Sequence, residues 1–188
     1  MNLPMWQMWS GVLTDSDVNN IIEVCEKFPE ENAKVGDDST VQGRADEAVR
    51  RSHVHWVRDR GMYELCWDYA MQANRNAFGF QISCVGDVQY TKYYGNDNGK
   101  YDWHFDTFWQ SPDAFHRKLS VTIQLSDSSD YEGGDFQYDP QYPSPDPQSL
   151  RKKGTIFVFP SYISHRVTEV TKGTRKSLVS WIEGPRFR

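Results

Sequence analysis

The chain has 188 residues, a formal net charge of −5 and an aromatic content of 14%. This length suits one domain with a sizeable core, so we expect a single domain over residues 1–188. The acidic balance argues against nucleic-acid partners held through phosphates, and no apolar run reaches the length of a membrane span. We also expect no signal peptide, because the first residues lack a charged segment followed by a long apolar run.

Three cysteines, Cys25, Cys66 and Cys84, lie far apart without metal-binding spacing. Their odd number and wide spacing predict reduced thiols and a cytoplasmic location. We expect all three to be small buried hydrophobic residues. The oligomeric state stays open.

The part of the chain up to about residue 79 is predicted to be a mainly helical support. Residues 6–13 form an apolar segment that suits an edge strand. Thr14 is an N-cap signal for a helix whose apolar positions recur at helical spacing until Pro29 ends it. The other elements expected here are a polar loop over residues 30–47, a strand over residues 50–57 and a helix over residues 61–78 that Gly79 ends.

From residue 80 onward the pattern changes to short strands separated by turns. Residues 119–125 alternate, with Leu119, Val121 and Ile123 on one face. We predict an α+β, mainly β fold: a double-stranded β-helix, or cupin-like jelly roll, over residues 80–182, with the N-terminal helices bracing one sheet. The other strands are expected at residues 81–94 (one or two strands), 101–108, 133–138, 154–160, 163–170 and 174–182, with turns at 95–99 and 171–173 and an exposed proline-rich loop at 139–149.

A candidate metal site begins with His104 and Asp106. Two residues apart on a strand, they would share one face. A third ligand must come from elsewhere, and His165 is the best candidate. Two His and one carboxylate make the facial triad of non-heme Fe(II) oxygenases. A surface hydrogen-bonded pair, a zinc site and a rival site at His53 and His55 are the alternatives.

Arg175 follows His165 by ten residues, which gives the candidate site a cation. Its planar fork suits a carboxylate, such as the far end of a keto acid that chelates iron. A strand over residues 174–182 would place Arg175, Ser177, Val179 and Trp181 on one face, where Trp181 could wall the same pocket.

With these motifs in order, the sequence resembles the Fe(II)/2-oxoglutarate dioxygenases, and within them the prolyl 4-hydroxylase-like branch that includes PKHD-type hydroxylases. The segments that carry the resemblance are residues 89–93, 101–106, 117–120, 132–136 and 154–181. It implies His104, Asp106 and His165 as iron ligands and catalytic residues. It also implies that Arg175 binds the distal carboxylate of 2-oxoglutarate, helped by Tyr93, with Tyr101 as a second pocket tyrosine.

The same resemblance implies Fe(II), 2-oxoglutarate and O₂ as cofactor and co-substrates, with ascorbate as a candidate reductant. It favours hydroxylation of a prolyl residue in a peptide or protein, with 2-oxoglutarate decarboxylated to succinate and CO₂. A free amino acid or small metabolite as substrate, or a binding module without catalysis, are the alternatives.

Aromatic residues flank the His-x-Asp pair and bear on the substrate. Some could line a substrate groove, but we expect most of them in the core or barrel wall. They are Trp103, Phe105, Phe108 and Trp109. Tyr142 and the proline-rich loop are candidates for a lid.

Overall fold

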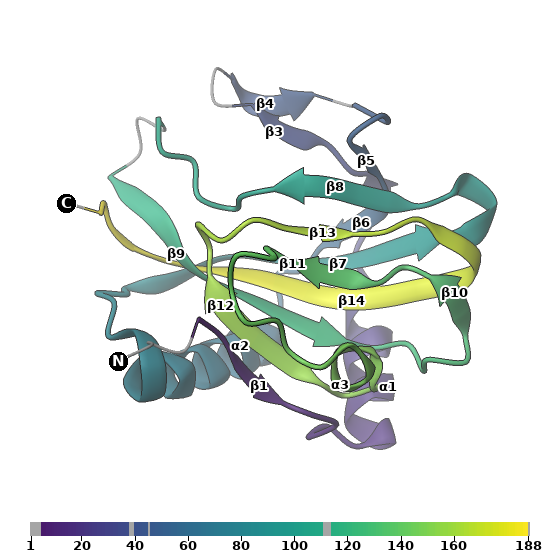
Figure 1. Ribbon diagram of the computed structural model, residues 1–188, viewed down its shortest axis with the longest axis horizontal. Helices are drawn as coiled ribbons and strands as arrows, with labels where there is room; N and C mark the ends of the chain where they lie inside the picture. Colours follow the sequence, from purple (N-terminus) through teal and green to yellow (C-terminus); the bar gives the residue numbers. More distant parts are fainter. Residues whose placement is uncertain (1–4, 38–39, 45, 111–113, 188) are drawn as a thin grey trace.

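A computed structural model describes residues 5–37, 40–44, 46–110 and 114–187. The strands form two antiparallel sheets and a separate hairpin, and helices α1 (Asp15–Cys25) and α2 (Arg60–Ala73) pack against the larger sheet (Figure 1). The predicted double-stranded β-helix with bracing helices is confirmed. No helix in the described part of the chain has the length and apolar composition needed to cross a membrane.

The larger sheet is built from strands that are far apart in sequence. In spatial order its strands are β1 (Gln7–Trp9), β12 (Ile156–Pro160), β9 (Phe115–Gln124), β14 (Val170–Pro185), β7 (Cys84–Tyr94), β6 (His53–Trp56) and β2 (Glu30–Asn32), and β10 (Tyr131–Gly133) also pairs with β14. The smaller sheet has the order β11 (Phe136–Tyr138), β13 (His165–Val167), β8 (Lys100–His104) and β5 (Arg50–Arg51). Strands β3 (Val35–Asp37) and β4 (Thr40–Arg44) form a separate hairpin.

The helices begin and end where local chemistry dictates. Helix α1 (Asp15–Cys25) starts at Thr14, whose hydroxyl and the Asp17 carboxylate form a reciprocal capping box. Helix α2 (Arg60–Ala73) continues into a π-helical turn, η1 (Asn74–Phe78), which ends at Gly79 with a positive φ. A 3-10 turn, η2 (Gly95–Asp97), follows β7, and α3 (Pro147–Arg151) is a single helical turn.

The larger sheet has two different faces, and this separation positions the site. Leu119, Val121 and Ile123 of β9 are fully buried in the core formed with the two long helices. Each such side chain contributes roughly 1.5–3 kcal/mol of hydrophobic stabilisation. On the opposite face of β14, the predicted row of Arg175, Ser177, Val179 and Trp181 lines a pocket. Alternation therefore places apolar residues toward the helices and functional residues toward the smaller sheet.

The loop expected over residues 30–47 is wrong, because this segment contains β2, β3 and β4. Strand β2 pairs with β6 at the sheet edge, where its exposed polar residues show no apolar alternation. The strand expected over residues 50–57 is split at Ser52: β5 joins the smaller sheet and β6 joins the larger one.

The strand expected at residues 133–138 and the turn expected at residues 171–173 are also wrong, because pairing with distant strands decides both segments. Residues 133–138 form parts of β10 and β11, in different sheets, with Gly134 at positive φ between them. The turn expected at residues 171–173 lies inside β14, because β10 supplies a pairing partner there. The proline-rich loop also ends in α3, for which the Asp146 side chain is the N-cap.

Burial of the cysteines differs from the expectation at one position. Cys25 and Cys66 are buried free thiols, and burial raises the pKa of each to about 12. Cys84 is exposed at the beginning of β7. The expectation of three buried cysteines is therefore wrong for Cys84.

Candidate metal centre and co-substrate pocket

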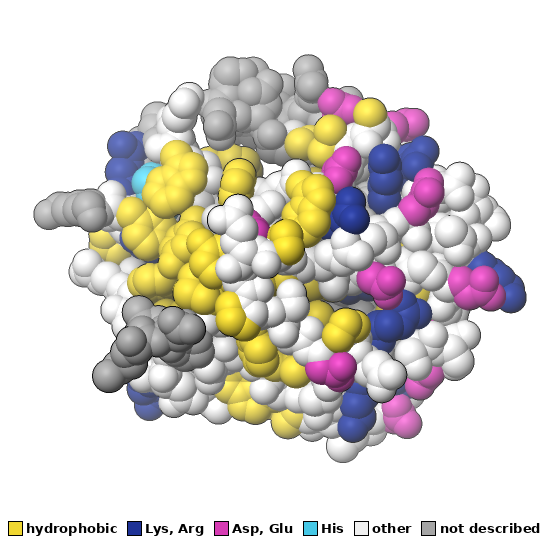
Figure 2. Space-filling model, in the orientation of Figure 1, with side chains coloured by type: hydrophobic (Ala, Val, Ile, Leu, Met, Phe, Trp, Pro, Cys, Tyr) yellow, Lys and Arg dark blue, Asp and Glu magenta, His cyan; other side chains and the backbone are white. Residues whose placement is uncertain are grey.

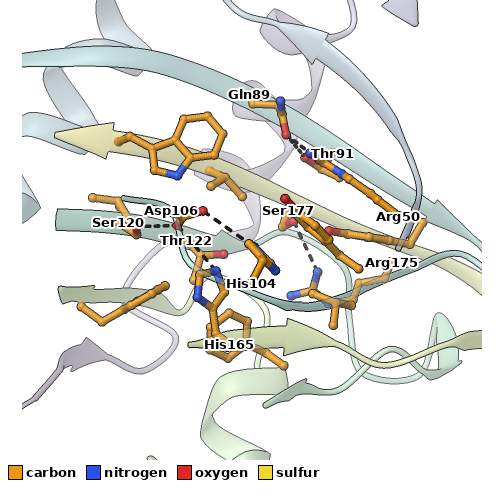
Figure 3. A pocket seen from close by; sticks show the side chains of 18 residues that line it. Arg50, Gln89, Thr91, His104, Asp106, Ser120, Thr122, His165, Arg175 and Ser177 are labelled. Carbon is orange, nitrogen blue, oxygen red and sulfur yellow. Dashed lines mark hydrogen bonds and ion pairs between the residues drawn. The ribbon is translucent and has the colours of Figure 1, made fainter. Parts of the chain in front are cut away.

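The three predicted metal ligands come together where strands β8 and β13 of the smaller sheet pair. They are His104, Asp106 and His165. His104 is the last residue of β8 and is paired with His165, the first residue of β13. Asp106 Oδ1 lies 3.7 Å from His104 Nε2, and Asp106 Oδ2 lies 3.5 Å from His165 Nε2. Potential ligand atoms of all three residues lie within 4.8 Å of one another. Figure 3 shows the three side chains converging.

Backbone carbonyls fix the orientation of both imidazoles. His104 Nδ1 lies 2.7 Å from the Asp102 carbonyl oxygen, and His165 Nδ1 lies 3.0 Å from that of Ile163. Because a carbonyl only accepts, each Nδ1 carries the hydrogen and donates it. Each Nε2 lone pair is then directed toward Asp106, which is the tautomer that a metal ligand requires.

The expectation that alternation places Asp106 on the same strand face as His104 is wrong. Strand β8 ends at His104, and the Asp106 amide donates instead to the Ser161 carbonyl, at 2.9 Å. Ser120 on β9 donates its hydroxyl to Asp106 Oδ2 at 2.6 Å. Ser161 and Ser120 thus position the carboxylate from two other segments, a role that no motif in the sequence indicated.

The protonation states of the cluster suit a divalent cation. Burial, together with the neighbouring His165, lowers the pKa of His104 to about 3, so its imidazole is neutral at physiological pH. Burial acts to raise the pKa of Asp106, but the two imidazoles and the Ser120 hydrogen bond outweigh it and lower that pKa. Two imidazole nitrogens and an ionised carboxylate fit Fe(II), for which this donor set is the facial triad.

The triad lies in a pocket between the two sheets (Figure 3). The pocket also contains the other predicted site residues, Arg175, Tyr93, Tyr101 and Trp181. Arg175 is buried, its Nη1 donates to Ser177 Oγ at 3.4 Å, and its guanidinium carbon lies 5.6 Å from the centre of the Tyr93 ring. Within the described residues no carboxylate lies at ion-pair distance from Arg175.

Tyr101 and Trp181 form parts of the wall. The Tyr101 ring stacks on His104 with ring centres 3.5 Å apart, and burial raises the pKa of its hydroxyl to about 12. Trp181 Nε1 is buried without a hydrogen-bond partner among the described residues, and the Arg117 guanidinium carbon lies 3.9 Å from its ring. Trp181 therefore has a buried donor that no group among the described residues uses.

Sequence reasoning missed several pocket residues. Gln89 and Thr91 precede Tyr93 at the alternate positions of β7 that face the pocket, so the alternation could have identified them. Arg50 also lines the pocket, from a strand of two residues that carries no periodic signal.

The two histidines of the rival site lie elsewhere. His55 on β6 is buried, with Nδ1 2.7 Å from the Phe28 carbonyl oxygen and Nε2 3.1 Å from Glu30 Oε2. His53 contacts Glu30 and Asp97. In the part of the chain that the structure describes, neither belongs to a group of three potential metal ligands.

The aromatic residues next to the triad do not form the core or barrel wall, so that expectation is wrong for most of them. Trp103, Phe105 and Trp109 are exposed by 40%, 56% and 53%. Phe108 is half-buried, and Arg117 lies over its ring. Figure 2 shows hydrophobic side chains gathered on one face of the molecule, with Lys and Arg side chains beside them. Tyr142 packs against Tyr138 and is not among the residues that line the pocket.

The family model of the 2OG-Fe(II) oxygenase superfamily matches residues 88–183, just over half of the chain. The chain belongs to the 2OG-Fe(II) oxygenase superfamily. The cofactor and co-substrates expected from the sequence, Fe(II), 2-oxoglutarate and O₂, are those of this family. The matched segment contains the His104–Asp106 pair, His165 and Arg175.

Curated relatives confirm the expected branch. A PKHD-type hydroxylase from Synechococcus sp. (strain CC9311) is 42% identical over 88 residues, which covers 45% of this chain and 37% of that protein. Another from Prochlorococcus marinus is 34% identical over 103 residues, or 53% of this chain and 42% of that protein. The chain thus matches about two fifths of the length of these relatives.

Solved structures share the fold over almost the whole chain. A Pseudomonas putida prolyl-4-hydroxylase has a TM-score of 0.68 at 18% identity and covers 97% of this chain and 93% of its own. A Trichoplax adhaerens prolyl hydroxylase, solved with a hypoxia inducible factor peptide fragment, has a TM-score of 0.71 at 17% identity and covers 95% and 83%.

Proposed function

We propose that this chain is an Fe(II)/2-oxoglutarate-dependent dioxygenase that hydroxylates a C–H bond and converts 2-oxoglutarate to succinate and CO₂. The observation that carries the proposal is one pocket with two parts. Its first part is the His104, Asp106 and His165 cluster, and its second is the buried guanidinium of Arg175, which has no carboxylate partner within the described residues.

The residues of the chain have distinct roles in this proposal. His104, Asp106 and His165 hold Fe(II), which when bound supplies the activation of O₂. Arg175 binds the distal carboxylate of 2-oxoglutarate through its planar fork, with Tyr93 beside it. Tyr101 and Trp181 wall the site and exclude water, and the carbonyl contacts of the two imidazoles orient each Nε2 as a metal ligand.

A zinc hydrolase is disfavoured by the same pocket. Such an enzyme usually needs a carboxylate other than the metal ligand as a general base. Among the described residues that line the pocket, Asp106 is the one acidic side chain, and it faces both imidazoles. An inactive binding module is also disfavoured, because all three ligands and Arg175 are present.

The substrate we propose is a prolyl residue in a peptide or protein. The names of the relatives and structural neighbours support this class. Trp181 Nε1 is a buried donor without a partner among the described residues, which a backbone carbonyl of the substrate would satisfy. Exposed Trp103 and Phe105, next to the triad in sequence, offer apolar surface to a peptide. A free amino acid is the second candidate, which the additional cation Arg50 in the pocket favours.

The experiment that tests this proposal compares substrates in one assay. Purified protein with Fe(II) and 2-oxoglutarate is offered proline-containing peptides and, separately, free amino acids, and the products are measured by mass spectrometry. We expect a mass gain of one oxygen on a peptide proline, with one succinate formed per product. Oxidation confined to free amino acids would replace the peptide by the second candidate, and succinate formation in no condition would contradict the enzyme class.

A further inference from the structure

A second buried guanidinium lies in the pocket, and neither the triad nor Arg175 accounts for it. Arg50 on β5 is 8% exposed and lines the pocket. Its Nε donates to Ser52 Oγ at 2.9 Å and its Nη2 to Gln89 Oε1 at 2.7 Å. Its guanidinium carbon lies 4.5 Å from the centre of the Tyr101 ring. All three partners are neutral, and Nη1 has no hydrogen-bond partner among the described residues.

The charges of the pocket do not balance without an additional anion. Arg50 and Arg175 are both buried cations, and Asp106 is the one carboxylate in the described lining. Fe(II) would add two positive charges and 2-oxoglutarate would add two negative ones, so a positive charge remains. An unpaired buried charge is costly, and that cost falls when a ligand supplies the opposite charge.

Strand register separates Arg50 from the 2-oxoglutarate end of the pocket. Across β7 and β14 the inward-facing pairs are Tyr93 with Arg175, Thr91 with Ser177, and Gln89 with Val179. Arg50 bonds to Gln89, whereas the Arg175 guanidinium bonds to Ser177, which is paired with Thr91. The two contacts therefore lie one pair apart, or roughly 7 Å along the strand.

The metal end lies one pair from this contact in the other direction. The next inward-facing position of β14 is Trp181, which is paired with Ser120, and Ser120 binds the Asp106 carboxylate. Figure 3 shows Gln89 on the side of His104 away from His165, and Arg50 extending toward Gln89 from the side of Arg175. The Arg50 guanidinium lies over the Tyr101 ring, which stacks on His104, so Arg50 borders the metal centre, where the reacting molecule must lie.

We propose that Arg50 is a second anion-binding residue of this pocket and that it binds a carboxylate of the molecule that is hydroxylated. This inference rests on the proposed function and specifies its substrate class. The substrate carries a carboxylate close to the oxidised carbon. That carboxylate is either the α-carboxylate of a free amino acid or an acidic side chain next to the proline of a peptide.

Arg166 offers a matched control, because it makes the same kinds of contact outside the pocket. Its Nε donates to Gln137 Oε1 at 2.7 Å, and its guanidinium carbon lies 4.9 Å from the centre of the Trp103 ring. Arg166 is not among the residues that line the pocket. An effect that comes merely from losing an arginine stacked on an aromatic ring should appear in both variants.

The test measures binding of probe pairs that differ in one carboxylate. The first pair is L-proline and L-prolinamide, and the second is the capped tripeptides acetyl-Ala-Pro-Asp-amide and acetyl-Ala-Pro-Asn-amide. Dissociation constants are measured by calorimetry with Mn(II) and 2-oxoglutarate present and O₂ absent. We expect wild type to bind the acid of one pair about tenfold or more tightly than its amide, because an arginine fork pairs strongly with a carboxylate.

Arg50→Met should abolish this preference, and Arg166→Met should keep it. Arg50→Gln, which retains a polar side chain toward Ser52 and Gln89, replaces Arg50→Met if the latter does not fold. A preference within the proline pair would identify a free amino acid as the source of the carboxylate, and a preference within the tripeptide pair would identify an acidic side chain of a peptide. Absence of a preference in wild type, or a preference that survives the loss of Arg50, would overturn the proposal.

A separate measurement distinguishes failure of this inference from failure of the proposed function. The half-saturation concentration of 2-oxoglutarate in succinate formation without substrate should change less than about twofold in Arg50→Met, since Arg175 and not Arg50 binds that molecule. If Arg50→Met raises it tenfold or more, Arg50 belongs to the co-substrate site and the inference is wrong while the proposed function stands.

Discussion

Arg175 is the residue whose proposed role can be isolated from metal binding. Truncating one partner of a buried charge pair costs roughly 2–5 kcal/mol, or about thirty- to several-thousand-fold in affinity. We predict that Arg175→Met raises the half-saturation concentration of 2-oxoglutarate within this range, and that Arg175→Lys has a smaller effect because it keeps the charge. Succinate formation at saturating Fe(II) measures both variants.

The control for this prediction is Arg60→Met, which removes an exposed arginine whose partner is Glu64 four residues later on α2. It should leave the half-saturation concentration unchanged. Metal affinity should also be unchanged in Arg175→Met, because Arg175 contributes no ligand. Wild-type half-saturation in Arg175→Met would remove this residue from the co-substrate site.

Ser120 tests whether residues behind the ligands tune the metal centre. Its hydroxyl donates to Asp106 Oδ2 at 2.6 Å and also lies 2.9 Å from Ser161 Oγ. Loss of such a supporting hydrogen bond typically weakens metal affinity about 10–100-fold. We predict a weakening of this size in Ser120→Ala, measured by Mn(II) titration. Ser129→Ala, in an exposed loop, should bind Mn(II) like wild type, and equal affinities of all three proteins would show that Ser120 does not support the site.

At the scale of elements, Gly173 in β14, two residues before Arg175, has a backbone conformation that suits glycine. This residue has φ +72°, and a Cβ there would collide with the Asp130 carbonyl oxygen. Gly79, at the end of η1, has φ +65° but open space around it. Comparing alanine substitutions at Gly79 and Gly173 therefore separates the cost of backbone strain from the cost of steric collision.

We predict that Gly79→Ala destabilises the protein by about 1 kcal/mol, the cost of a left-handed backbone alone. Gly173→Ala should cost about 3 kcal/mol, because overpacking adds to that strain. Urea unfolding measures both variants. Gly173→Ala should also raise the half-saturation concentration of 2-oxoglutarate, since Gly173 precedes Arg175 by two residues, and equal destabilisation of the two variants would contradict the account.

The edge strand β2 is held to its neighbours by Glu30. Lys92 Nζ lies 2.6 Å from Glu30 Oε2 and His55 Nε2 lies 3.1 Å from it. The Lys92 hydrogen bond, opposed by burial, lowers the pKa of Glu30 below its usual value of 4.5. A carboxyl group with a lowered pKa stabilises the fold above its unfolded-state pKa and loses that contribution as pH falls through its folded-state pKa.

We therefore predict that Glu30→Gln lowers the melting temperature at pH 7, and that the difference from wild type shrinks as the pH falls below 4.5 and through the lowered folded-state pKa. Glu23→Gln, which alters a largely exposed helical pair with Lys27, should have little effect at either pH. A difference that stays constant between pH 7 and pH 3.5 would show that the charge of Glu30 is not what anchors β2.

At the scale of the whole molecule, the sequence predicted the core and the ligand residues better than the edges. The alternation at Leu119, Val121 and Ile123 and the cap at Thr14 are local signals, and the structure agrees with both. His104, His165 and Arg175 were identified by residue type and spacing, and the fold brings them into one pocket.

What could not be predicted depends on long-range pairing. Strand β2 has polar residues, and only its partner β6 makes it a strand. Ser120 and Arg50 acquire their places because β9 and β5 come next to the triad from distant parts of the chain. Exposure of Trp103 and Phe105 was missed because a pattern of aromatic residues does not reveal which face of a sheet is covered.

The most direct test of the central claim is succinate formation from 2-oxoglutarate as Fe(II) is titrated into wild type and into His104→Ala, Asp106→Ala and His165→Ala. The three variants remove polar residues outside the core with the helices, so circular dichroism should show that they fold. We predict that succinate rises with Fe(II) and saturates in wild type, and that each variant forms almost none. Wild-type succinate formation by any folded variant would contradict the assignment of that residue to the metal centre.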